Sequence, residues 1–85
     1  MLSATRKKLS FRAWHRGTRE ADLLMGRFAD AFLPGCSDSE EAEFAKLLEE
    51  TDPDIYDWIT GRIPLPQKSF DPLLQAMIDF YRLAA

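Results

Sequence analysis

Cysteine and histidine are scarce in this chain of 85 residues, each occurring once, as Cys36 and His15. One cysteine cannot form an internal disulfide, so nothing in the sequence indicates an oxidising compartment. The two residues together also fall short of the ligand set of a structural zinc site. His15 lies among arginines, without an acid that would orient its ring for proton transfer. We therefore predict no metal site and no catalytic residue.

Glycine-rich segments and long apolar runs are missing as well. The four glycines are scattered singly, so the chain has no phosphate-binding loop or dinucleotide fingerprint and should hold no cofactor of its own. Every apolar run is far shorter than the roughly 20 residues of a membrane-spanning helix, and we expect no membrane insertion. A composition of 46% hydrophobic and 29% charged residues is typical of soluble globular proteins, and with 85 residues it predicts one compact domain over residues 1–85.

The net charge of −3 is unevenly distributed. Residues 1–20 contain six bases and one acid, whereas the remaining residues contain five bases and thirteen acids. This polarity suggests a cationic face for an acidic or nucleotide-bearing partner, although a merely solvated basic helix explains it equally well. The acidic remainder argues against nucleic-acid binding, because domains that bind phosphates ordinarily carry a high overall positive charge.

Helix signals follow one another along the chain, and the alternation typical of strands is nearly absent. We predict a first helix over residues 8–15, followed by a corner at Gly17, because glycine readily adopts the left-handed backbone that ends many helices. A second helix should run from there to the break at Pro34 and Gly35. Its three-and-four spacing passes through Glu20, Leu24, Phe28, Ala31 and Phe32.

Two further helices begin at clear capping signals. Ser37 and Glu40 have the spacing of a capping box, with Asp38 and Glu41 as an equally spaced alternative. Asp52 should cap the next helix with its carboxylate, directly before Pro53. The predicted core residues of these two helices are Phe44, Leu47, Leu48, Ile55, Trp58 and Ile59.

The end of the chain predicts a linker and one more helix. Gly61 should close the preceding helix, and residues 62–68, with two prolines, should be extended. Asp71 and Pro72 open the last helix, whose apolar stripe contains Leu74, Met77, Ile78 and Tyr81. We therefore predict an all-α fold, a small antiparallel bundle of four to five short helices.

The segment Arg16-Gly17-Thr18-Arg19-Glu20 is the most informative part of the sequence. It gathers two guanidinium groups and a carboxylate around a glycine corner at the start of a helix. A purely structural interpretation is available, in which Gly17 ends one helix and Glu20 complements the dipole of the next. The motif is short and weak by itself.

With its surroundings, this segment resembles the signature of the succinate dehydrogenase flavinylation factors of bacteria and mitochondria. That signature is Arg-Gly-x-x-Glu, matched by Arg16, Gly17 and Glu20, then an acid and an apolar helix. A second matching block stands at the expected separation and comprises Phe44, Leu47, Leu48, Glu49, Asp52, Asp54, Ile55, Tyr56 and Trp58. Two blocks at the right distance are much more specific than either alone. The departures, such as Ala21 for a larger aliphatic residue, concern packing and local charge.

The resemblance implies a function for the chain. Such factors are small helical proteins that bind the flavoprotein subunit of succinate dehydrogenase or fumarate reductase and promote covalent attachment of FAD to it. It implies an assembly factor that is not itself an enzyme and that could contact the client's FAD. The implied interface comprises His15, Arg16, Gly17, Arg19 and Glu20.

Within that interface, the resemblance gives each residue a role. Gly17 would allow close approach to the client, and Arg16, aided by Arg19, would stabilise negative charge on the flavin. Glu20 would orient the client histidine or pair with a client arginine. Tyr56 and Trp58 should belong to the core or its rim.

Other functions remain open at this point. A general helical adaptor and, with less support, a small nucleic-acid-binding domain are the alternatives. We expect a monomer. We also expect a bacterial cytoplasm in preference to a mitochondrial matrix, because few residues precede the first predicted helix and none resemble a removable leader.

Overall fold

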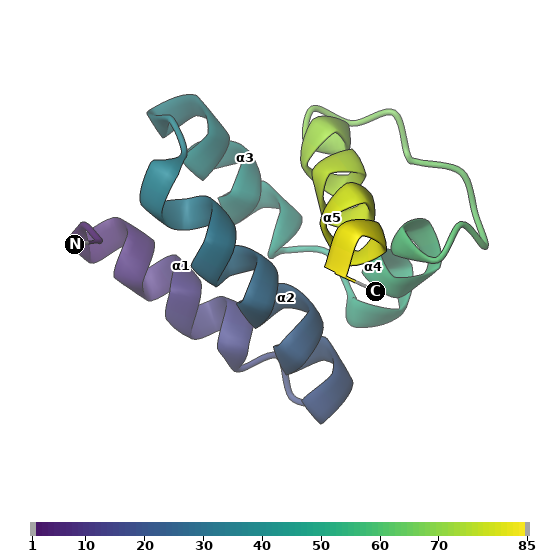
Figure 1. Ribbon diagram of the computed structural model, residues 1–85, viewed down its shortest axis with the longest axis horizontal. Helices are drawn as coiled ribbons and strands as arrows, with labels where there is room; N and C mark the ends of the chain where they lie inside the picture. Colours follow the sequence, from purple (N-terminus) through teal and green to yellow (C-terminus); the bar gives the residue numbers. More distant parts are fainter. Residues whose placement is uncertain (1, 85) are drawn as a thin grey trace.

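The computed structural model describes residues 2–84, which form five α-helices and one 3₁₀ helix (Figure 1). The elements are α1 (Ala4–Trp14), α2 (Arg19–Phe32), η1 (Leu33–Gly35), α3 (Asp38–Leu47), α4 (Asp52–Ile59) and α5 (Asp71–Ala84). No strand occurs among these residues. The all-α prediction is therefore confirmed. Within residues 2–84, no helix combines the length and the apolar character needed to cross a bilayer.

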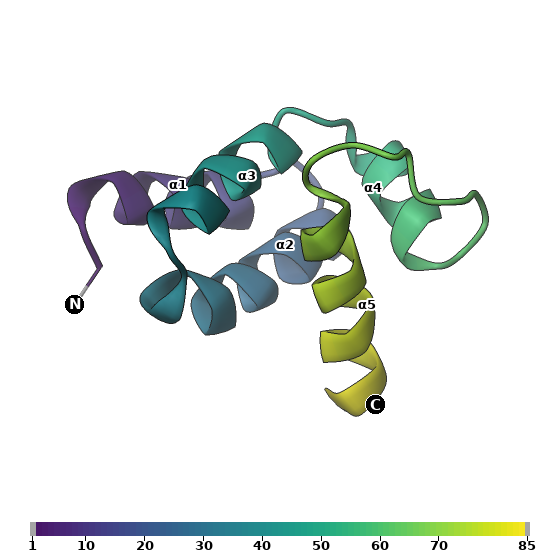
Figure 2. The same ribbon diagram turned by 90° about the horizontal axis from the view of Figure 1, so that it is seen from above.

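The helices form two groups. In Figure 1, α1 and α2 make an antiparallel pair with α3 beside them, while α4 and α5 lie together on the other side of α2. Figure 2 shows that α5 crosses the direction of the first three helices steeply. Side chains of α2, α4 and α5 line an open groove between these helices.

Side-chain caps fix most of the helix starts. The predicted capping box is confirmed in both halves, with Glu40 N donating to Ser37 Oγ at 3.1 Å and Ser37 N donating to Glu40 Oε1 at 2.8 Å. The first helix begins four residues earlier than predicted, because Ser3 Oγ accepts a hydrogen bond from the backbone N–H of Arg6. Such caps satisfy N–H groups that have no partner inside the helix.

The predicted cap of α4 is wrong by one residue. Thr51 is the N-cap, and its Oγ1 accepts from Asp54 N at 3.3 Å, whereas Asp52 and Pro53 occupy the first helical turn. Threonine and aspartate can both cap a helix, but here Arg16 binds the Asp52 carboxylate. Thr51 therefore caps the helix, and its neighbour Asp52 forms the ion pair with Arg16.

The inward face of α2 also differs from the prediction. The predicted stripe included Ala31, which is exposed, and Leu24, which is half-buried. The helix instead buries a stripe displaced by one position, comprising Ala21, Met25, Gly26, Phe28 and Ala29. Apolar residues occur on more than one side of α2, so spacing alone could not identify its core face.

The core joins all five helices. Its centre is aromatic, with the Phe28 ring 6.2 Å from that of Phe44 and 5.8 Å from that of Phe80. The buried residues of α1 are Leu9 and Ala13. Among the predicted core residues, those that are buried are Phe28, Phe44, Leu47, Leu48, Ile55, Trp58, Leu74 and Met77, whereas Ile59, Ile78 and Tyr81 are half-buried. Each such aliphatic or aromatic side chain contributes roughly 1.5 to 3 kcal/mol when fully buried.

Two of the four basic residues of α1, Arg6 and Arg12, pair with acids of the molecule. Arg6 donates to the Leu33 carbonyl at 3.1 Å and lies 3.5 Å from Asp38. Arg12 donates to Glu49 at 3.0 Å. The predicted cationic face is therefore smaller than the sequence suggested, because acids of the neighbouring α3 and of its end pair with these arginines.

Candidate functional site

The corner between α1 and α2 has the geometry that the sequence predicted. Gly17 has φ = +116°, a region that side chains with a Cβ rarely adopt. Thr18 then caps α2, its Oγ1 accepting from Ala21 N at 3.2 Å. The Asp22 carboxylate accepts hydrogen bonds from Arg16 N and, at 3.2 Å, from Gly17 N. Asp22, in the first turns of α2, therefore stabilises the corner through these two hydrogen bonds.

The Arg16 side chain points into the molecule. Its Nε donates to Asp52 Oδ1 at 2.7 Å, and its two terminal nitrogens donate to the carbonyl oxygens of Leu48 and Glu50, both at 2.6 Å. Only 11% of the side chain is exposed. Three charge-assisted hydrogen bonds to the α3–α4 turn therefore occupy the guanidinium group.

The side chains of Arg19 and Glu20 point outward at the start of α2. Both residues are exposed, and no hydrogen bond or ion pair joins either side chain to another residue in the range 2–84. The His15 ring is exposed too and stacks on the Phe11 ring with 3.9 Å between centroids. The predicted site residues are thus neighbours in space, but Arg16 faces inward while His15, Arg19 and Glu20 face solvent.

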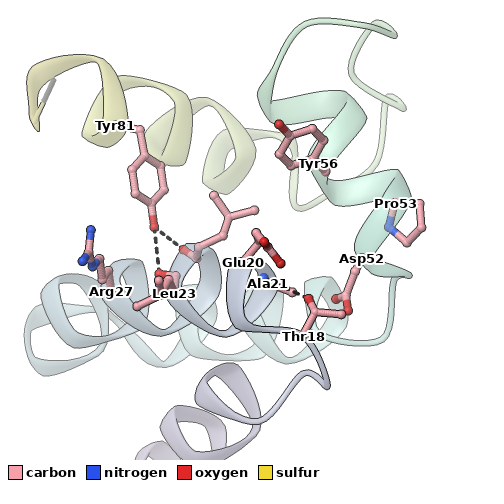
Figure 3. A pocket seen from close by; sticks show the side chains of 10 residues that line it. Thr18, Glu20, Ala21, Leu23, Arg27, Asp52, Pro53, Tyr56 and Tyr81 are labelled. Atoms are coloured by element: carbon pink, nitrogen blue, oxygen red, sulfur yellow. Dashed lines mark hydrogen bonds between the residues drawn. The ribbon is translucent and has the colours of Figure 1, made fainter.

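Beside Glu20 lies an open groove of about 600 Å³ between α2, α4 and α5 (Figure 3). We call it the Glu20 groove. Its lining residues are Thr18, Glu20, Ala21, Leu23, Leu24, Arg27, Asp52, Pro53, Tyr56 and Tyr81. The lining is mostly apolar. Figure 3 shows Arg27 and Glu20 on either side of Leu23 and Tyr81.

A second hollow, of about 510 Å³, lies at the corner itself. Its lining residues are Trp14, His15, Gly17, Thr18, Arg19, Asp22 and Leu23. Leu23 and Thr18 border both hollows. Glu20 therefore lines the first hollow, whereas His15 and Arg19 line the second.

Two aromatic residues build walls of the Glu20 groove, and sequence reasoning assigned neither of them there. Tyr56, expected at the core or its rim, is 52% exposed, while Trp58 is buried as expected. The Tyr81 hydroxyl donates to the backbone carbonyl of Leu24, which ties α5 to α2. Burial of the Tyr81 phenol raises its pKa. Tyr81 and Leu24 are 57 residues apart, and no local pattern in the sequence predicts a contact over that separation.

Sequence reasoning also missed the close packing of Gly26. A Cβ at this position would overlap the indole of Trp14, so α1 and α2 approach one another where Gly26 has no side chain. The indole Nε1 donates to Asp30 Oδ1 at 3.1 Å, which fixes the ring over the glycine. This contact holds the two helices that flank the corner. A glycine inside an amphipathic helix was the available signal.

No cluster of three metal-binding side chains occurs in the described part of the chain. Cys36 is buried, with a pKa raised by that burial, which disfavours the reactive thiolate.

Comparisons with known proteins agree with the resemblance seen in the motif. A family model described as flavinator of succinate dehydrogenase matches residues 7–81. The FAD assembly factor SdhE of Acetobacter pasteurianus is 40% identical over 82 residues, which cover 96% of this chain and 75% of the relative. No solved structure matches the chain.

Mitochondrial relatives match as well. Succinate dehydrogenase assembly factor 2 of Debaryomyces hansenii is 43% identical over 79% of this chain, and its counterpart in Dictyostelium discoideum is 36% identical over the same share. The chain spans 49% and 48% of these two relatives. Because the family model covers most of the sequence and includes the Gly17 corner, the chain belongs to the family of succinate dehydrogenase flavinators.

Proposed function

We propose that this protein is an assembly factor that binds the flavoprotein subunit of succinate dehydrogenase and promotes covalent attachment of FAD to it. Family membership supports this proposal. One structural observation carries it: Glu20 is exposed at a rigid corner and has no partner side chain among residues 2–84. A carboxylate held outward in this way is available to another protein.

We propose that the chain acts as a template and not as an enzyme. The described residues include no oriented nucleophile or base at the corner, so the chemistry would belong to FAD and to the client histidine. The factor would hold flavin and histidine in a reactive arrangement. Correct placement alone can contribute about 7 to 11 kcal/mol in favourable intramolecular reactions.

The roles within the interface follow from which side chains are exposed. Glu20 would orient the client histidine or pair with a client arginine, and Arg19 would face negative charge on the flavin, with His15 beside it. For Arg16 we now propose a positioning role, since its guanidinium group is bonded to Asp52 and to two backbone carbonyls. Gly17 would give the corner its shape.

The proposal can be tested by reconstitution. The client flavoprotein without covalent flavin is mixed with FAD, with or without this chain, and the flavin that stays attached after denaturation is measured. Wild-type chain should increase covalent flavin strongly, and Glu20→Gln should lose most of that increase. Glu49→Gln, which removes an exposed carboxylate that follows α3 and pairs with Arg12 at the surface, is the control and should promote flavin attachment as wild type does. Full activity of Glu20→Gln would remove the proposed role of the corner.

Three finer points remain predictions. Fumarate reductase could be a second client, and covalent flavin in that enzyme can be measured in the same way. We predict a monomer, which sedimentation can check. A bacterial cytoplasm is our proposed location, supported by the bacterial relative, with the mitochondrial matrix as the alternative that the mitochondrial relatives keep open.

A further inference from the structure

The Glu20 groove has opposite charges at its two ends and apolar side chains between them. We propose that it receives a segment of the client flavoprotein in which an apolar side chain lies between a basic and an acidic one. The basic side chain would lie beside Glu20 and the acidic one beside Arg27. This inference rests on the proposed function and extends the client interface from the corner into the groove.

The two charges are arranged along a single helix. Glu20 and Arg27 are seven residues apart on α2, so they lie on one face with about 10 Å between them along the helix axis. Both are exposed, and no hydrogen bond or ion pair joins either side chain to another residue in the described range. Asp52 at the Glu20 end is bonded to Arg16. An oppositely charged pair with the same spacing would therefore meet two unoccupied partners.

The region between the charges is suited to an apolar side chain. Leu23 and Leu24 are only half-buried on the side of α2 that faces the groove. Tyr56 forms part of the opposite wall and is 52% exposed. Tyrosine is enriched in protein interfaces, where a large ring with a polar end gains contact area at low entropic cost. Apolar surface that is concave and rimmed by charge is typical of docking sites.

The shape of the groove favours the client over a second copy of this chain. A two-fold pairing of two copies with its axis through the groove would place hollow against hollow. A hollow of about 600 Å³ needs a convex occupant. The groove also begins at Glu20, the residue that we propose for client contact. A client segment can therefore continue from the corner into the groove.

Binding measurements with the isolated client flavoprotein test the inference. Arg27→Glu and Tyr56→Ala should each raise the Kd about tenfold, as expected for an interface charge and an interface tyrosine. Arg62→Glu makes the same charge change in the linker, where Arg62 is exposed. The Kd of this control for the client should stay within about twofold of the wild-type value. All three altered side chains are exposed, and unchanged thermal unfolding should verify folding.

The outcomes separate the inference from the proposed function. If wild type promotes flavin attachment while Arg27→Glu and Tyr56→Ala bind the client as wild type does, the groove inference is overturned and the proposed function stands. If wild type neither binds the client nor promotes attachment, both fail. A dimer in sedimentation that Tyr56→Ala dissociates, with client binding unchanged, would identify a second copy as the occupant and overturn the inference.

Discussion

Arg16 and Glu20 are four residues apart in one motif, yet the corner directs them to opposite environments. The Arg16 guanidinium is 11% exposed and bonded to the α3–α4 turn, whereas the Glu20 carboxylate faces solvent without a partner in residues 2–84. One half of the motif therefore stabilises the fold, and the other half is available to a client. If a substitution of Arg16 abolishes function, the free energy of unfolding of that variant must also be measured before Arg16 is called an interface contact.

Removal of the inward arginine should have the largest effect. Arg16→Ala should lower the free energy of unfolding by about 3 kcal/mol, because it breaks a largely buried ion pair and leaves two turn carbonyls without their donor. Chemical denaturation measures this change. The control is Arg12→Ala, which removes an arginine whose ion pair with Glu49 lies at the surface. Arg12→Ala should lower the free energy of unfolding by no more than about 1 kcal/mol.

Equal, small losses for Arg16→Ala and Arg12→Ala would contradict a structural role for Arg16. Arg16→Lys sharpens the comparison. Lysine keeps the charge but cannot supply the forked donors that reach Asp52 and both carbonyls, so this variant should fall between wild type and Arg16→Ala.

The packing beneath the corner should give the next largest effect. Gly26→Ala should lower the free energy of unfolding by about 2 kcal/mol, because the new Cβ displaces the Trp14 indole. Trp14 fluorescence should change with it. Gly35→Ala is a matched control, since its Cβ would meet no atom within 4 Å. Similar stabilities for the two variants would show that α1 and α2 can separate at no cost.

A smaller effect is expected at the corner itself. Gly17→Ala should lower the free energy of unfolding by about 1 to 2 kcal/mol, because alanine is strained at φ = +116°. A Cβ at Gly17 would contact nothing in the chain within 4 Å, so any clash must come from a client. Urea denaturation and client affinity should be measured together. Unchanged affinity in a folded Gly17→Ala variant would argue against close approach of the client at this position.

Local signals in the sequence predicted much of the fold. The capping box joins Ser37 and Glu40, only three residues apart, and the positive φ of Gly17 depends on that residue alone. Both were predictable because their causes lie within one helical turn.

Other features depend on partners that lie far along the chain. Arg16 is 32 to 36 residues from its three acceptors, and Tyr81 is 57 residues from Leu24. No local pattern could direct Arg16 inward or form a groove at α2. The apolar residues on two sides of α2 were a signal of a second, exposed apolar face, but spacing did not say which side was the core.

The free energy of unfolding of Glu20→Gln tests most directly whether Glu20 serves a client and not this bundle. We predict a loss of no more than about 0.5 kcal/mol in urea denaturation, since only a weak interaction with the dipole of α2 is removed. A loss above about 1.5 kcal/mol would contradict the account, because exposed groups without partners rarely contribute so much.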